Sequence, residues 1–244
     1  MPNTDFKTGV IKPIEIFKEG WELIKGQYWI LFGIAIVGAL IGAFSMYLLL
    51  GAMMCGIYYC YIQKIDGKDV TFEGLWKGFD KFLPALLVTV LIVVPLFVVY
   101  VIIYIPIILA AVMGPKLSSD ELTQMFIGAI AVDSILILLM TCFHTLLIFA
   151  FPLIIDRNLG AWQSIVVSSK AVWGNLSGIV GMIGVAFIAF IPISILTCGI
   201  GAYLLMPIML AGYALAYRRI FPAINSQTYN PPPPDAYRGA GSYN

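Results

Sequence analysis

Long apolar stretches dominate the chain, and short segments that mix apolar and charged residues separate them. Four stretches contain no Asp, Glu, Lys or Arg: 26–63, 82–115, 134–155 and 171–217. A helix needs about 20 predominantly apolar residues to cross a ~30 Å hydrocarbon core, so the first and last stretches allow two crossings each and the others one. The apolar residues are continuous rather than alternating, which indicates helices rather than barrel strands. The pattern predicts an all-α, polytopic membrane protein with six transmembrane helices.

These crossings divide the chain into three regions. Residues 1–27 form an N-terminal amphipathic segment, residues 28–221 a six-helix membrane domain, and residues 222–244 a Pro/Tyr-rich tail. The tail is expected to be disordered, although its proline run is also suited to docking in an aromatic groove. Two crossings fit within 28–64 only if both are short. The expected spans lie near 28–46, 48–64, 84–110, 126–154, 176–196 and 200–218.

Amphipathic segments precede the first, third and fifth spans. Residues 13–26, 71–82 and 161–175 each set aromatic and aliphatic side chains against charged or polar ones. This pattern is typical of helices that lie in the membrane interface, and tryptophan favours the headgroup layer. A short amphipathic helix followed by two spans would then occur three times, which suggests a threefold internal repeat. The expected interfacial anchors are Trp21, Trp29, Trp76, Trp162 and Trp173.

The Lys and Arg residues predict the orientation. Cytoplasmic loops carry an excess of Lys and Arg near the span ends. Of the 14 such residues, Lys7 and Arg238 lie far from any span, and Lys116 alone falls on the other side. Both termini are therefore expected in the cytoplasm. The residues that share the cytoplasmic side near span ends are Lys12, Lys18, Lys25, Lys64, Lys68, Lys77, Lys81, Arg157, Lys170, Arg218 and Arg219.

Composition agrees with a membrane protein and excludes other classes. Apolar residues make up 61% of the chain, charged residues 11%, and the mean hydropathy is +0.95, which is incompatible with an ordinary soluble domain. A net charge of +1 without a basic stripe excludes a nucleic-acid partner. The expected partners are membrane lipids, and a membrane or cytoplasmic protein is a further candidate.

Ionisable residues inside the fourth span are the first place to look for function, because burying them is costly. Asp133 and His144 are eleven residues apart, three helical turns, so they share a face about 16 Å long. Ser134, Thr141 and Thr145 add hydroxyls near that face. The five residues could form a polar path for protons or a polar solute. Alternatively, Asp133 lies at the outer interface, and a neutral His144 needs only one partner, such as a backbone carbonyl or a hydroxyl.

Catalytic and metal chemistry find little support in the sequence. His144 is the single histidine, and no HExxH, GxSxG or GxxxxGK[ST] motif is present. The four cysteines lie in or beside apolar stretches without a CxxC pair, as expected of small packing residues. We therefore expect no catalytic residue, metal or cofactor, and a protein that is not an enzyme.

Small residues recur at helical spacing and predict close helix packing. Gly38 precedes Gly42 by one turn, and Gly174, Gly178 and Gly181 follow one another around the start of the fifth span. Such spacings let helix backbones approach closely, within one bundle or between copies of the chain.

Several segments carry a family resemblance. They include FPLIIDR (151–157), SSKAVWGN (168–175), ALAYRR (214–219), 51–56 and 72–82. Together they resemble bacterial integral-membrane families grouped with the membrane domain of glycerophosphoryl diester phosphodiesterase, many of whose members are uncharacterised. The resemblance covers about residues 10–221 and implies a stand-alone relative of an accessory membrane domain in the bacterial plasma (inner) membrane. The catalytic domain of that phosphodiesterase has no counterpart among these segments, so the resemblance transfers no catalytic residue.

Two hypotheses about function follow. In the preferred one, the chain is a non-enzymatic membrane protein whose interfacial helices organise lipid or a partner protein at the cytoplasmic face. In the alternative, it is a small-molecule or lipid transporter that uses the polar face of the fourth span.

Overall fold

The computed structural model describes residues 5–113 and 118–223, and within these ranges the chain is helical and contains no strand. Lys116 and residues 224–244, which include most of the predicted tail, lie outside the described residues. The all-α prediction is confirmed. The elements are α1 (Pro13–Ile24), η1 (Lys25–Gln27), α2 (Tyr28–Phe44), α3 (Leu50–Ile65), η2 (Phe72–Lys81), α4 (Phe82–Met113), α5 (Ser119–Leu146), α6 (Ala150–Arg157), α7 (Ala161–Gly174), α8 (Leu176–Leu196) and α9 (Ile200–Ile220).

Five helical stretches in the described part are long and apolar enough to cross a membrane: Pro13–Phe44, Phe72–Leu109, Ser119–Arg157, Leu176–Leu196 and Ile200–Ile220. Helix α3, which corresponds to the expected span 48–64, has only 16 residues and is not among them. Most of its side chains are buried within the protein. The length and apolar composition of these five stretches thus indicate that the chain is a helical membrane protein.

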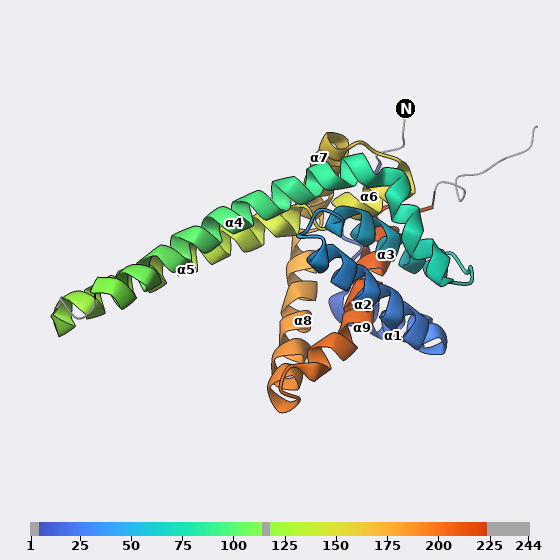
Figure 1. Cartoon of the computed structure of the whole chain (residues 1–244). Helices are drawn as coiled ribbons and strands as arrows, with labels where there is room; N and C mark the ends of the chain where they lie inside the picture. Colours follow the sequence, from blue (N-terminus) through green and yellow to red (C-terminus); the bar gives the residue numbers. More distant parts are fainter. Residues whose placement is uncertain (1–4, 114–117, 224–244) are drawn as a thin grey trace, which may run out of the picture.

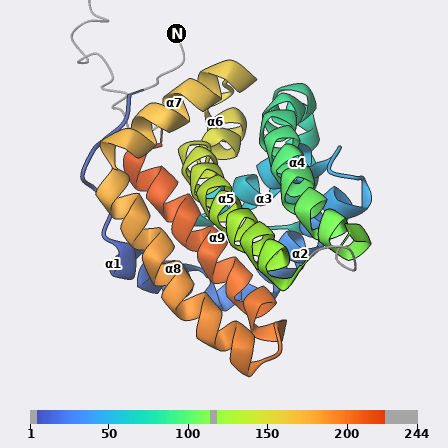
Figure 2. The ribbon, with the colours of Figure 1, turned by 90° about the vertical axis from the view of Figure 1, so that its left-hand side faces the viewer.

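Two helical hairpins project outward from a core that is built around α3. Helix α3 packs against α2, η2, α4, α6 and α9. The α4–α5 hairpin extends far from this core, and the α8–α9 hairpin leaves it in another direction (Figure 1). Viewed from the tip of the first hairpin, α5 lies between α4 and the α8–α9 pair (Figure 2). The hairpins expose large apolar side chains such as Leu138 and Ile188, which suits a lipid environment.

Glycines bring α3 into backbone contact with its neighbours. A Cβ atom built on Gly56 would lie 1.9 Å from the carbonyl oxygen of Leu75 in η2, and one on Gly51 would lie 2.4 Å from the carbonyl oxygen of Ala85 in α4. Gly78 of η2 approaches α3 in the same way, since its Cβ would lie 1.8 Å from the carbonyl oxygen of Ala52. No other residue fits at these distances without moving the backbone.

The glycines around the start of α8 pack against the N-terminal segment rather than another long helix. Gly178 lies against Ile11, and Gly181 lies against Pro13. The Asn175 side chain donates a 3.0 Å hydrogen bond to the carbonyl oxygen of Lys7, whose own N–H donates to Ile220 at the end of α9 (2.9 Å). Residues 5–12, which we call the N-terminal strap, therefore tie the α7–α8 junction to the end of α9.

The helix expected over 126–154 differs from the observed structure. Helix α5 begins at Ser119, and a turn over 147–149 separates it from α6. Pro152 explains the turn, because its ring would clash with the preceding turn of a continuous helix. The buried Ser168 of α7 stabilises the break: its hydroxyl donates to the Leu146 carbonyl oxygen (2.7 Å) and accepts from the Phe149 N–H (3.1 Å).

Ser118 and Glu121 form a capping box at the start of α5. The Glu121 N–H donates to the Ser118 hydroxyl oxygen (3.3 Å), and the Ser118 N–H donates to the Glu121 carboxylate (2.8 Å). Two donors that the helix cannot pair by itself are thereby satisfied.

Gly56→Ala is expected to lower the free energy of unfolding by about 3 kcal/mol or more, because the added methyl group collides with backbone rather than with a movable side chain. Gly128→Ala on α5 is the matched control, since nothing lies within 4 Å of its Cβ position, and it should change stability by less than about 1 kcal/mol. The measurement is unfolding of the purified protein in mixed detergent micelles. Equal effects of the two substitutions would contradict the described packing.

Candidate functional site

A charged cluster joins the ends of three helices. The Arg218 guanidinium of α9 donates two hydrogen bonds to Asp66, which follows α3, from Nε (3.0 Å) and Nη2 (2.5 Å). Its Nη1 donates to Asp156 of α6 (2.9 Å), which also accepts from the Tyr217 hydroxyl (2.7 Å). A planar guanidinium suits this forked arrangement, and the contact is strong because both partners are charged. We call Asp66, Asp156, Tyr217 and Arg218 the Arg218 cluster.

A second arginine holds the end of the described chain. Arg157 is buried, its Nη2 donates to the carbonyl oxygen of Pro222 (2.5 Å), and its guanidinium carbon lies 5.8 Å from the centre of the Phe221 ring. Its Nε lies 3.5 Å from the Asp156 carboxylate. The charges at this end thus serve mainly to fix α6 and α9 to each other.

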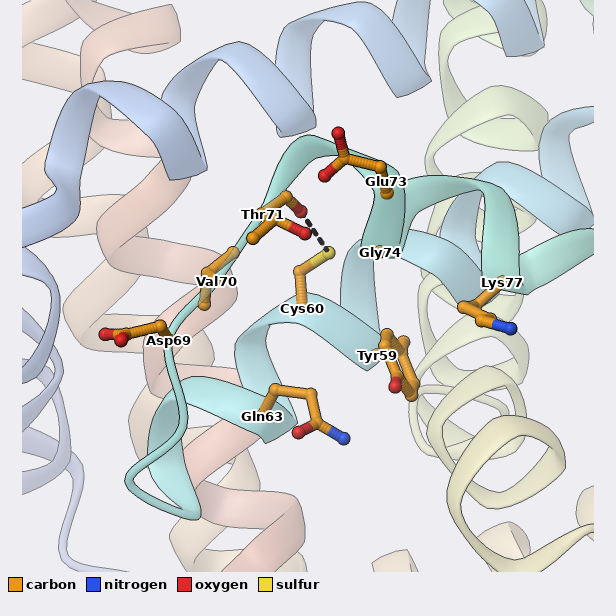
Figure 3. Close-up of a pocket in the computed structure, with 9 residues that line it drawn as sticks. All are labelled: Tyr59, Cys60, Gln63, Asp69, Val70, Thr71, Glu73, Gly74 and Lys77. Carbon is orange, nitrogen blue, oxygen red and sulfur yellow. Dashed lines mark hydrogen bonds between the residues drawn. The ribbon is translucent and has the colours of Figure 1, made fainter.

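Two hollows flank Tyr59 and Gln63 beside this cluster. The larger, of about 300 Å³, is lined by Asp66, Asp156 and Arg218 of the cluster among others. The smaller, of about 190 Å³, lies between α3 and η2 (Figure 3). Its acidic side chains, Asp69 and Glu73, do not converge on one point in Figure 3, and no group of three or more potential metal ligands exists among the described residues.

The smaller hollow offers little for catalysis. The Cys60 sulfur points toward Thr71 and lies 4.0 Å from its carbonyl oxygen, as the dashed line in Figure 3 shows. Its volume is below the roughly 300–1,000 Å³ of typical small-molecule sites. We interpret it as a surface depression at the α3–η2 contact.

A larger groove lies where the two hairpins meet. It has a volume of about 700 Å³, it is formed by α3, α4, α5, α8 and α9, and aliphatic side chains form most of its wall. Of the five residues predicted as a polar path, the structure brings Thr141, His144 and Thr145 to this groove. Asp133 and Ser134 lie farther along α5 and do not line it.

Hydrogen bonds within α5 satisfy four of the five predicted polar residues. Ser134, Thr141 and Thr145 each donate their hydroxyl proton to the carbonyl oxygen four residues earlier, at 2.7–2.8 Å. The Nδ1 atom of His144 lies 2.8 Å from the carbonyl oxygen of Met140 and must be the donor in this contact. Within the described residues, the half-buried Asp133 carboxylate forms no ion pair or hydrogen bond. The hydroxyls therefore supply no chain of free donors between Asp133 and His144.

The five predicted tryptophan anchors are all exposed, with exposed fractions from 44% at Trp21 to 73% at Trp162. They lie on α1, α2, η2 and α7, and Trp21, Trp29 and Trp76 contact aromatic neighbours. Trp29 meets Tyr28 at a centroid distance of 5.2 Å, and Trp76 stacks on Phe79 at 6.0 Å. The indoles thus form aromatic groups on the protein surface.

The comparison with known proteins identifies a family. The chain matches the family described as "Protein of unknown function (DUF975)" over residues 23–223. It belongs to the DUF975 family. No curated protein and no solved structure matches the chain. The DUF975 match shows no link to glycerophosphoryl diester phosphodiesterase, so that resemblance stays a prediction.

The Arg218 cluster of this DUF975 chain was not predicted, although the sequence contains a signal for it. Asp156 and Arg218 each follow directly after a stretch without charges, and Asp66 comes three residues after another. In the six-span arrangement these three positions share one side of the membrane. Opposite charges at the ends of neighbouring helices are therefore candidates for pairing, but the sequence alone does not show which helices are neighbours.

Arg218→Gln is expected to lower the free energy of unfolding by about 3 kcal/mol, because it removes the cation paired with the partly buried Asp66 and one of the two paired with Asp156. Arg219→Gln, which removes only the more exposed pair with Glu19, should cost less than about 1 kcal/mol. Unfolding in mixed micelles compares the two variants. An equal loss would show that the cluster contributes no more than a surface ion pair.

Proposed function

We propose that the chain is a non-enzymatic integral membrane protein of a bacterial plasma membrane that organises lipid, or a partner protein, at the cytoplasmic face. The observation that carries this proposal is the exposure of the five tryptophans on α1, α2, η2 and α7. Exposed indoles at the start of an apolar helix, or on the shorter helix that precedes it, are suited to the headgroup layer. We call these side chains the tryptophan surface.

The proposed topology has six spans, formed by α2, α3, α4, α5, α8 and α9, with both termini in the cytoplasm. Helices α1, η2 and α7 then lie along the interface. The order of elements supports the threefold repeat, because α1, η2 and α7 each lead, directly or through a short turn, into a pair of helices.

Lysines on or beside two of the helices that carry the tryptophans favour lipid as the ligand of this surface. Lys12, Lys25 and Lys77 have side chains that are 70%, 56% and 59% exposed, on or beside α1 and η2. Near an anionic leaflet each such lysine contributes about 1 kcal/mol of attraction. Their partners in the protein are exposed carboxylates three residues away, and such pairs are weak enough for a headgroup to replace.

We propose no catalytic role, because the described sites offer no assembled pair of groups for acid–base or nucleophilic catalysis. The charges of the Arg218 cluster are engaged with one another, and His144 is the one ionisable side chain other than tyrosine that lines the 700 Å³ groove. Within the described residues, no hydrogen bond joins His144 to a tyrosine of the groove, so no acid and base pair is assembled there. Transport along α5 has weaker support, because Asp133 and Ser134 lie outside the groove.

Replacing Trp21, Trp76 and Trp162 together with alanine is expected to lower the melting temperature in nanodiscs of anionic phospholipid by about 4 °C, as a loss of roughly 1–2 kcal/mol implies. The same variant in detergent should melt close to the parent protein, since these side chains are exposed. The matched control replaces Phe44, Met46 and Leu196, which are exposed at hairpin turns. A loss of equal size in detergent would contradict the proposal.

Fusions test the topology. Green fluorescent protein fused after Arg219 should fluoresce, and alkaline phosphatase fused there should be inactive, because the proposed location is cytoplasmic. Fusions after Ser118, between α4 and α5, should give the opposite result. Active phosphatase after Arg219 would refute the six-span arrangement.

A further inference from the structure

The groove between the hairpins opens within the apolar part of the molecule. Four of its five elements, α4, α5, α8 and α9, belong to candidate membrane spans. Apolar residues on its wall, such as Leu96 and Ile137, are 49% and 56% exposed. In a bilayer the molecules that meet this opening are lipids. The volume of about 700 Å³ falls within the roughly 300–1,000 Å³ of small-molecule sites.

The polar atoms of the groove specify an uncharged ligand group. No Asp, Glu, Lys or Arg lines it. A phosphate or carboxylate there would be desolvated without a permanent cation to balance it. The groove therefore favours a lipid whose polar group carries no charge.

The polar side chains that α5 contributes favour a hydrogen-bond donor on that lipid. His144 uses Nδ1 to donate to Met140, so Nε2 of the neutral ring is an acceptor. Thr141 and Thr145 have already donated their protons within α5 and also retain only acceptor capacity. The hydroxyls of Tyr58, Tyr100 and Tyr213, which also line the groove, can donate as well as accept. A lipid hydroxyl, which does both, matches this set of groups.

The polar and apolar parts of the groove are separated along α5. Ile137 lines one end, and Thr141, His144 and Thr145 line the end next to α6. The distance from Ile137 to Thr145 along the helix is about 12 Å. This order matches an amphiphile that lies along α5, with its chain beside Ile137 and its hydroxyl beside His144.

We propose that the groove binds a diacylglycerol-type lipid, with one acyl chain against the aliphatic wall and the free hydroxyl donating to Nε2 of His144. In the proposed topology the hydroxyl lies toward the cytoplasmic leaflet. This site is separate from the tryptophan surface, so either proposal can fail without the other.

Native mass spectrometry of the full chain in detergent tests the site with three probes: dioleoylglycerol, its 3-O-methyl ether and dioleoylphosphatidylglycerol. Dioleoylglycerol should bind one per chain. The ether, which lacks the donor, should bind about fivefold more weakly, as expected for one neutral hydrogen bond. The phosphatidylglycerol should bind more weakly than dioleoylglycerol, because its phosphate is charged.

Two pairs of variants locate the binding. Ile137→Trp fills the groove and should reduce dioleoylglycerol binding by at least about tenfold, whereas Leu138→Trp, its exposed neighbour outside the groove, should leave it unchanged. His144→Phe should abolish the preference for dioleoylglycerol over the ether, and His144→Gln, which retains an acceptor, should keep it. Equal binding of alcohol and ether to the parent protein, or equal effects of the two tryptophan substitutions, would overturn the proposal.

Discussion

Helix α3 meets η2 and α4 with backbone against backbone, at distances that only glycine allows. This contact places a short, largely buried helix at the centre of a protein whose long helices α5 and α8 are mostly exposed to their surroundings. Because Gly51 and Gly56 have no side chain, η2 and the beginning of α4 lie directly on α3. The position of α4 in turn fixes one wall of the groove, and Tyr58 of α3 forms part of its floor.

Polar contacts join further helices to the core that the glycine contacts form. The Arg218 cluster joins the ends of α3, α6 and α9, and Ser168 binds the free backbone groups at the turn between α5 and α6. Both sites connect segments that apolar packing alone would hold with little directional preference. In lipid this matters more than in water, because helix association gains little from the hydrophobic effect. Directional contacts therefore define how the helices of this chain are arranged.

The sequence predicted which segments are helical better than it predicted which helices are buried and what they contact. Continuous apolar stretches predicted the all-α class, although α5 begins at Ser119 and not near residue 126 as expected. The burial of α3 could not be predicted, because helices that face lipid and helices that face the protein interior are equally apolar. The turn before Pro152 depends on Ser168, a residue of another helix. Of the predicted polar path, Thr141, His144 and Thr145 lie at one groove while Asp133 does not, because α5 extends well beyond the core.

The N-terminal strap has a consequence for how the chain crosses a membrane. A hydrogen bond of 2.9 Å between the Lys7 N–H and the Ile220 carbonyl oxygen requires both atoms to be on the same side of the bilayer. The number of complete crossings between them must therefore be even. The five candidate spans cannot each cross exactly once without α3 or another segment also crossing. A single contact between two distant backbone atoms thus gives the parity of the topology independently of the Lys and Arg positions.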